Sequence, residues 1–374
     1  MANAADGAPV PGWDWLPEPA GLANAGATCH ANAAAQALMA AEPRVSAAVH
    51  ALCHPGGART GGWAGGVGTA TGLVAATRRV RGAAFAVGQS CAREDVDAAL
   101  DALLGPVPGG YPSALAAAAD DAVAAGDPAA VAAACDGRRR AAAFAAGDPF
   151  AWLAYSASYC PACRAVSGAR YEVGRTLVVP PSGLAGPSGP RCSPHSPQSY
   201  ESRRVGSPDH PAAGSAEAGA GRTLGESVAL GLDEAPEGRC PAGHRGLVRA
   251  ARLVRAPPCL ALAVPGGGAP RGGAPPGGWG AAIPLELDVP LPGGAARTGE
   301  ETGVVRYRQS AQIEHFGGPY GGHYTARALR RRPGAEPGAA PAVYAFDDQG
   351  VAPSAFDHPA SVVMVFYTRL PTAA

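Results

Sequence analysis

A cysteine follows a glycine-rich turn near the beginning of the sequence. Residues 21–30 read GLANAGATCH, so Asn24 and two glycines precede Cys29, and an alanine-rich stretch that favours a helix follows it. A cysteine at a helix N-terminus feels the positive end of the helix dipole and unpaired backbone N–H groups, and both favour the nucleophilic thiolate. The alternative is a small buried cysteine in an ordinary alanine-rich helix.

Two histidines eight residues apart flank a loop that contains four glycines. Residues 315–324 read HFGGPYGGHY, and His323 opens a predicted strand. An imidazole fixed at a strand edge can act as a general base, and glycine neighbours allow a substrate backbone to approach closely. The carboxylates of Asp347 and Asp348, at the end of another predicted strand, could orient that imidazole. The alternatives are a glycine hinge with incidental histidines and an aspartate pair solvated in a turn.

A CxxC motif, Cys160 to Cys163, lies between two predicted strands. The chain has nine cysteines at irregular spacings in 374 residues, which is not the pattern of a small disulfide-rich protein. In a reduced protein a CxxC motif indicates zinc binding or a redox pair. The cysteines outside the candidate sites are expected to be small buried residues: Cys53, Cys91, Cys135 and Cys259.

The elements that must position these residues change from helices to strands along the chain. Helices are predicted over residues 29–53, with an interruption near Pro43, over 93–105, and as short pieces within 111–146. Strands are predicted over 151–159, 169–180, 247–264, 283–291, 303–314, 323–329, 342–347 and 361–369. This order predicts an α+β fold with a mixed, mostly antiparallel sheet.

Composition excludes several classes of protein. Thirty basic and thirty acidic residues balance, so no charge excess indicates nucleic acid or an anionic membrane as a partner. No signal peptide or transmembrane segment is evident, and we expect the cytoplasm or the nucleus. Residues 1–17 are expected to form an extended leader, and the Pro/Ser/Gly-rich residues 181–221 to be disordered. Residues 265–282 are predicted to be a Gly/Pro-rich loop.

In the order Cys, His, Asp, these motifs resemble those of the ubiquitin-specific protease family, the papain-like deubiquitinases. The family's Cys box, G-L-x-N-x-G-x-T-C-x-x-N-x-x-x-Q, is matched by Gly21, Leu22, Asn24, Gly26, Thr28, Cys29, Asn32 and Gln36. Its His box, Y-x-x-x-A-x-x-x-H-x-G-x-x-x-x-G-H-Y, is matched by Tyr307, Ala311, His315, Gly317, Gly322, His323 and Tyr324. The sequence F-D-D follows at residues 346–348, as in the family.

The resemblance implies a papain-like fold for residues 18–370, with a helical thumb, a mostly antiparallel β palm and a reduced zinc-binding fingers region at about 155–250. It also implies hydrolysis of the isopeptide or peptide bond after the C-terminal glycine of ubiquitin, through a thioester acyl-enzyme. The expected partners are ubiquitin and ubiquitinated proteins, with no nucleic acid and no membrane, and the chain is expected to act as a monomer.

The resemblance assigns a role to each matching residue. Cys29 is the nucleophile, His323 the general base and Asp347 the residue that orients the imidazole, while Asn24 matches the residue that stabilises the oxyanion. Asp95 matches an acidic residue that grips the basic C-terminal tail of ubiquitin; a solvated acidic helix start is the alternative. Further substrate contacts are implied for three other His-box residues, His315, Gly322 and Tyr324.

The resemblance also implies structural Zn²⁺, because members of the family often carry two CxxC knuckles in the fingers. Cys160 and Cys163 form the first knuckle, and Cys240 with His244 takes the place of the second as C-x3-H. One alternative second pair is Cys192 with His195, in the Pro/Ser-rich segment. Another is a lost metal site with a leftover knuckle.

The sequence departs from the family pattern at positions that affect packing and substrate binding. The departures are Ala27, His30, Ala98, Ala99, Arg327, Val343 and the absence of an L-x-R-F motif after Leu260. None of them removes a catalytic group. Two further hypotheses therefore stand beside the deubiquitinase: a catalytically weak or inactive ubiquitin-binding adaptor, and a protease that acts on a ubiquitin-like modifier.

Overall fold

A computed structural model gives the arrangement of most of the elements predicted above. It describes residues 13–26, 28–54, 68–81, 92–107, 145–160, 162–163, 166–179, 224–225, 228, 239–240, 242–245, 248–264, 283–291, 303–318, 321–336, 338–356 and 361–371. The predicted disordered segment 181–221, the loop 265–282, residues 1–12 of the leader and nearly all of 111–146 lie outside the described residues. The alternative ligands Cys192 and His195 lie outside them as well.

The helices form the N-terminal part of the fold. Their bounds are α1 (Cys29–Leu38), α2 (Pro43–Cys53), α3 (Thr71–Arg81) and α4 (Ala92–Leu104). The predicted interruption near Pro43 is confirmed, because Glu42 caps α2 by accepting a hydrogen bond from the backbone N–H of Val45 at 2.9 Å, and proline suits the first helical turn. The sequence did not predict α3, in which Gly72 lowers helix propensity but lets α3 approach the backbone of Leu52 closely.

An eight-stranded sheet forms the centre of the molecule. Its strands are β5 (Thr176–Val178), β7 (Cys259–Ala263), β8 (Glu286–Leu291), β9 (Gly303–Gly318), β10 (Gly321–Arg330), β11 (Ala342–Asp347), β12 (Gly350–Pro353) and β13 (Val362–Arg369). The strand order is β12-β11-β10-β9-β13-β7-β5, and β8 also pairs with β9. Within this sheet only β5 and β7 pair in parallel among the described strands, so the mixed, mostly antiparallel sheet was predicted correctly.

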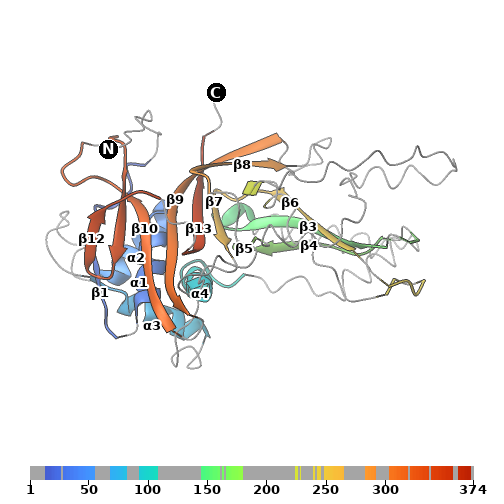
Figure 1. The fold of residues 1–374 in the computed structure, drawn as a ribbon, viewed down its shortest axis with the longest axis horizontal. Helices are drawn as coiled ribbons and strands as arrows, with labels where there is room; N and C mark the ends of the chain where they lie inside the picture. The colour runs from blue at the N-terminus through green and yellow to red at the C-terminus, as the bar shows by residue number, and fades with distance from the viewer. Residues whose placement is uncertain are drawn as a thin grey trace.

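A second sheet extends away from the helices. It has the order β4-β3-β6, with β3 (Trp152–Tyr159), β4 (Val166–Gly174) and β6 (Val248–Arg255). Figure 1 shows these strands as a long projection at the end of the molecule opposite α1, α2 and α3. A third, two-stranded sheet joins β1 (Leu22–Ala23), just before the Cys29 turn, to β2 (Gly68–Thr69) in parallel.

The main core lies between the helices and the large sheet. Nine of the ten residues of α1 are buried, and most of them are alanines, whose small side chains let the helix lie close to β10 and β9. Trp13 and Leu16, at the described end of the leader, are buried in the same cluster. A second cluster on the other side of the sheet contains Tyr307 and Tyr367, both fully buried. The core therefore anchors the helix that begins at Cys29 to the strand that carries His323.

Two other expectations can be compared with this fold. Cys53 and Cys259 are buried, as predicted, while Cys91 and Cys135 lie outside the described residues. None of the helices among the described residues combines the length and hydrophobicity needed to cross a lipid bilayer.

Candidate active site and metal centre

Asn24 organises the turn that precedes Cys29. Its side-chain Oδ1 accepts hydrogen bonds from the backbone N–H groups of Gly26 at 3.1 Å and Thr28 at 3.2 Å, and from the hydroxyl of Thr28 at 3.1 Å. Gly26 has a φ of +90°, a conformation that glycine adopts without steric cost. Helix α1 begins immediately afterwards with Cys29, which is 5% exposed. The cysteine thus lies at a helix N-terminus, where the sequence predicted it.

Asp348 connects the Cys29 turn to the end of β11. Its carboxylate accepts one hydrogen bond from Nδ2 of Asn24 at 2.9 Å and one from Nδ2 of Asn32 at 2.7 Å, and its backbone carbonyl accepts from the N–H of Leu22 at 2.9 Å. Its φ of +51° is unusual for a residue other than glycine, although aspartate adopts it more readily than most. The sequence suggested Asp348 only as a possible partner of the imidazole, whereas in the structure it bonds to two residues of the Cys box, Asn24 and Asn32.

His323 and Asp347 form a hydrogen-bonded pair at the edge of the large sheet. Nε2 of the imidazole lies 2.6 Å from Oδ1 of the carboxylate, and both side chains are well exposed. An ionised carboxylate can only accept, so Nε2 carries the proton of the neutral imidazole and Nδ1 carries its basic lone pair. This is the arrangement in which the carboxylate fixes the tautomer of a general base.

The sulfur of Cys29 and the imidazole of His323 form no hydrogen bond within the part of the chain that the structure describes. The two residues instead belong to elements that pack together, since α1 lies against β10. Hydrogen bonds between catalytic groups are often long before substrate binds, so both residues remain candidates for the site.

The His-box residues His315, Gly322 and Tyr324 form a packed group beside His323. The rings of His315 and Tyr324 stack with centroids 4.4 Å apart, and Tyr324 is 8% exposed. Burial lowers the pKa of His315 below its usual value. A side chain at position 322 would collide with the ring of His315, so glycine is required there for β9 and β10 to pair. In this structure these three residues support the β9–β10 hairpin.

Gln36, the last residue of the Cys box, links α1 by hydrogen bonds to the chain segment before it and to β10. Its Nε2 donates to the carbonyl of Ala20 at 2.7 Å, and its Oε1 accepts from the guanidinium of Arg330 at 2.6 Å. Arg330 is 1% exposed and lies over the ring of Phe346, and its burial lowers its pKa to about 9. The sequence did not predict that this arginine is buried, because an arginine in a strand usually lies at the protein surface.

Asp95 lies in the first turn of α4 and is 4% exposed. Its Oδ2 is 2.6 Å from Nδ1 of His30, the residue directly after Cys29. The predicted tail-binding carboxylate thus contacts the residue next to the candidate nucleophile, but it is buried and it already has a partner on α1.

Several departures from the family pattern have a structural counterpart. Ala98 and Ala99 are fully buried where α4 packs against its neighbours. Arg327 is 8% exposed, and its Nε lies 2.8 Å from Oε1 of the buried Glu314 on β9. These substitutions are therefore accommodated by packing and by a buried ion pair. Ala27 lies outside the described residues.

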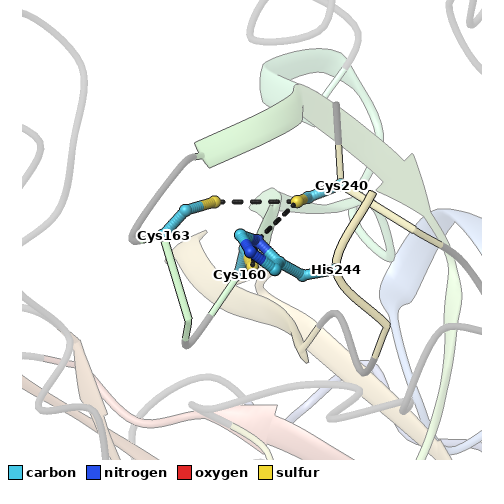
Figure 2. A group of neighbouring side chains, drawn as sticks. All are labelled: Cys160, Cys163, Cys240 and His244. Atoms are coloured by element: carbon cyan, nitrogen blue, oxygen red, sulfur yellow. Dashed lines mark hydrogen bonds between the residues drawn. The ribbon is translucent and has the colours of Figure 1, made fainter. Parts of the chain in front are cut away.

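The four predicted metal ligands converge at the far end of the β3–β4–β6 sheet. Figure 2 shows the side chains of Cys160, Cys163, Cys240 and His244 pointing toward one another. The Cys163 and Cys240 sulfurs are 3.6 Å apart, and Nδ1 of His244 is 3.8 Å from the Cys160 sulfur and 3.4 Å from the Cys240 sulfur. Tetrahedral zinc with ordinary bond lengths would place sulfurs about 3.8 Å apart and sulfur and nitrogen about 3.6 Å apart. The ligand set therefore fits zinc in type and spacing.

Local backbone geometry supports this metal centre. A tight turn presents Cys240 and His244, because the N–H of Cys240 donates to the carbonyl of His244 at 2.9 Å and Gly243 adopts a φ of +80°. Hydrogen bonding from the backbone N–H of Cys163 is the main factor that lowers the pKa of Cys160 to about 6. This favours the thiolate form of Cys160, which is the form in which cysteine binds zinc.

Comparisons with known proteins identify the fold but no family. No protein-family model matches the sequence, and no curated protein matches it. A chain of the solved Ubp8-Sgf11-Sgf73-Sus1 SAGA DUB module matches with a TM-score of 0.50 and 13% identity over 96% of this chain and 69% of that one. The SAGA DUB module bound to monoubiquitin gives 0.48 and 12% over 99% and 73%, and the module bound to ubiquitin aldehyde gives 0.48 and 13% over 96% and 71%. This α+β chain thus shares its fold with a chain of the SAGA DUB module.

Proposed function

We propose that this protein is a cysteine-dependent deubiquitinase of the ubiquitin-specific protease type. In the proposal, α1 to α4 correspond to the thumb, the large sheet to the palm, and the β3–β4–β6 sheet with its Cys/His cluster to the fingers. The shared fold with a chain of a DUB module supports the overall architecture. The motif residues and their contacts support the chemistry.

In the proposed reaction, Nδ1 of His323 removes the proton from the thiol of Cys29. The resulting thiolate attacks the carbonyl carbon of the terminal glycine of ubiquitin and forms a tetrahedral intermediate. The imidazolium then returns its proton to the leaving amine, and the C–N bond breaks to give a thioester. Water, deprotonated by the same imidazole, hydrolyses the thioester and releases ubiquitin with a free carboxylate.

Asp347 and Asn24 would assist this reaction in different ways. Asp347 fixes the Nε2–H tautomer of His323 and stabilises the imidazolium once it forms. The side-chain amide of Asn24 would donate to the developing oxyanion, an effect worth about 3 kcal/mol for one donor. One of its two N–H groups already donates to Asp348, which holds the amide in a fixed orientation. Such preorganisation is what an oxyanion donor needs.

The observation that carries this proposal is the double contact made by the adjacent aspartates. Asp347 bonds to His323, while Asp348 bonds to Asn24 and Asn32 on either side of Cys29. Two neighbouring backbone positions thereby link the predicted base to the predicted nucleophile segment. A packing role alone does not require both carboxylates to be directed at candidate catalytic segments.

A non-enzymatic ubiquitin-binding adaptor is the second candidate. The observation that favours it is the lack of a hydrogen bond between Cys29 and His323 among the described residues. An adaptor would retain the fold and the binding surface without turnover. The two candidates differ in one measurable respect, which is whether Cys29 reacts with an electrophile at the C-terminus of ubiquitin.

The remaining features of the proposal are a structural Zn²⁺ held by the Cys160 cluster, ubiquitin and ubiquitinated proteins as partners, and action in the cytoplasm or nucleus. The neighbouring solved structures are parts of four-protein modules, and the expected monomeric state of this chain remains a prediction. A ubiquitin-like modifier as substrate remains the alternative within the same chemistry.

The test is reaction with a ubiquitin probe that carries a C-terminal electrophile, alongside matched probes made from ubiquitin-like modifiers. We expect the ubiquitin probe to form a stable adduct with Cys29 and none of the others to do so. Cys29→Ala should abolish the adduct. Binding of ubiquitin without any adduct would support the adaptor, and an adduct with only another modifier would reassign the substrate.

A further inference from the structure

His30 occupies an unusual place beside the candidate nucleophile. It is the second residue of α1, directly after Cys29, where the family resembled by the sequence has an aromatic residue. Its Nδ1 is 2.6 Å from Oδ2 of Asp95, and the two side chains are 13% and 5% exposed. A short, largely buried contact between a nitrogen and a carboxylate is a strong hydrogen bond, and stronger still when the imidazole is protonated.

The partner of His30 is Asp95, the carboxylate to which the family resemblance assigns the basic tail of the substrate. Asp95 lies on α4, which packs against α1, so the contact joins two helices. A cationic side chain of a substrate can reach this carboxylate only if His30 shares it or releases it. Losing the His30 donor without a replacement would be unfavourable for a buried carboxylate, so the substrate has to supply a donor in its place.

We propose that His30 is a specificity-determining residue that competes with the basic tail of the substrate for Asp95. The inference rests on the proposed function and deepens it. Productive binding is an exchange in which a basic side chain of the tail replaces the imidazole. The exchange favours arginine over lysine, because a guanidinium can replace one hydrogen bond with a bidentate pair, whereas an ammonium offers only a compact point charge.

This competition makes an unusual prediction about variants of His30. Removing the imidazole raises the free energy of the unbound protein, because Asp95 loses a donor, but leaves the bound state unaffected. A variant without the imidazole is therefore less stable on its own and binds the tail more tightly. A residue with a merely structural role would give the opposite relation, since a loosened site binds its ligand less well.

The experiment measures ubiquitin binding in a Cys29→Ala background, so that turnover cannot interfere. Three forms are compared: His30 unchanged, His30→Gln, whose neutral amide can still donate, and His30→Phe, which cannot. Each is titrated calorimetrically with ubiquitin whose basic tail residues are all arginine, all lysine or all glutamine. Thermal unfolding of each free form is recorded in parallel.

We expect His30→Phe to lower Tm and to tighten binding of the arginine-tailed ubiquitin about ten-fold, the equivalent of one charged hydrogen bond, with His30→Gln between the two. The gain should be smaller for the lysine tail and absent for the glutamine tail. Unchanged or weaker binding by both His30 variants would overturn the inference, as would an equal gain for all three tails. Failure of the proposed function is measured separately, because the protein with Cys29 intact would then form no adduct with the ubiquitin probe, whether or not the three forms bind ubiquitin.

Discussion

Asp347 and Asp348 are adjacent in the sequence, yet their carboxylates face different halves of the candidate site. Asp347 bonds to Nε2 of His323 at 2.6 Å, whereas Asp348 bonds to Asn24 at 2.9 Å and Asn32 at 2.7 Å. Asp348 has a left-handed backbone, with φ at +51°, and its carboxylate has different partners although the two carboxylates lie within 4.8 Å of each other. The two residues are therefore expected to fail in different ways when they are changed.

Asp347→Ala should lower kcat by roughly 10²-fold or more while KM and Tm change little. The side chain is 68% exposed, so its loss costs little stability, but the imidazole loses the group that fixes its tautomer. Steady-state kinetics with a fluorogenic ubiquitin substrate and a thermal melt measure both quantities. A large fall in Tm with kcat retained would contradict the role assigned to Asp347.

Asp348→Ala should lower both Tm and kcat, because it removes the acceptor for Asn24 and Asn32 and so releases the turn before Cys29. Asp348→Gly serves as a matched variant, since glycine tolerates the positive φ and removes the same side chain. Both variants should lose activity, but the glycine variant should be the more stable of the two. If the losses of kcat caused by Asn24→Ala and Asp348→Ala were additive in free energy in a double-mutant cycle, the contact between Asn24 and Asp348 would make no contribution to catalysis.

Cys29→Ala should abolish hydrolysis and leave ubiquitin binding within about two-fold of the unchanged protein, because the thiol supplies chemistry and little contact area. Cys53→Ala is the control, since burial raises the pKa of this second cysteine to about 12 and makes it a poor nucleophile. Turnover and isothermal titration give the two quantities. Retention of turnover by Cys29→Ala would refute the proposed nucleophile.

Freshly purified protein should contain about one Zn²⁺ per chain, and Cys163→Ser should release it and lower Tm. Structural zinc sites contribute directly to folding, so the β3–β4–β6 sheet should lose protection from hydrogen exchange before the large sheet does. Elemental analysis and hydrogen-exchange mass spectrometry check the two parts. Zinc that stayed bound in Cys163→Ser but left in Cys53→Ala would place the metal elsewhere.

Stability should fall when the pH drops below about 6.5, because His50 and His54 stack at the end of α2 and burial lowers the pKa of both below their ordinary value of 6.5. In this pH range the two histidines bind protons in the unfolded chain but not in the folded chain. The free energy of unfolding therefore decreases as pH falls from 6.5 toward the lowered pKa values of the folded protein. Tm measured from pH 7.5 to 5 should decline, and the decline should be shallower in a variant with glutamine at both positions. An equal decline in that variant would assign the effect to other groups.

The sequence predicted the strands that carry His323 and Asp347 because their alternation and their flanking turns are strong local signals. It also predicted the start of α1 at Cys29 and the break before α2, which capping and proline chemistry determine locally. The four cysteine and histidine ligands were identified from spacing and family resemblance, and the structure brings them together. These features depend on short-range patterns.

The features that the sequence did not predict depend on tertiary contacts. The pairing of Asp95 with His30 joins residues that are 65 positions apart, and the bond between Asp348 and Asn24 spans 324 positions. No local pattern specifies such partners, because each of these polar residues could equally well face solvent when only its sequence neighbours are considered. The burial of Arg330 was missed for the same reason.

Strand β13 lies between β9 and β7 in the large sheet, although it is the last of the described strands in the sequence. The central part of the sheet is therefore incomplete until residues 362–369 have left the ribosome, and the helix that begins at Cys29 has no finished sheet to pack against before then. Strand pairings between residues so far apart in sequence form slowly. The large sheet that supports the helix of the proposed enzyme's nucleophile would consequently be completed only after translation has passed residue 369.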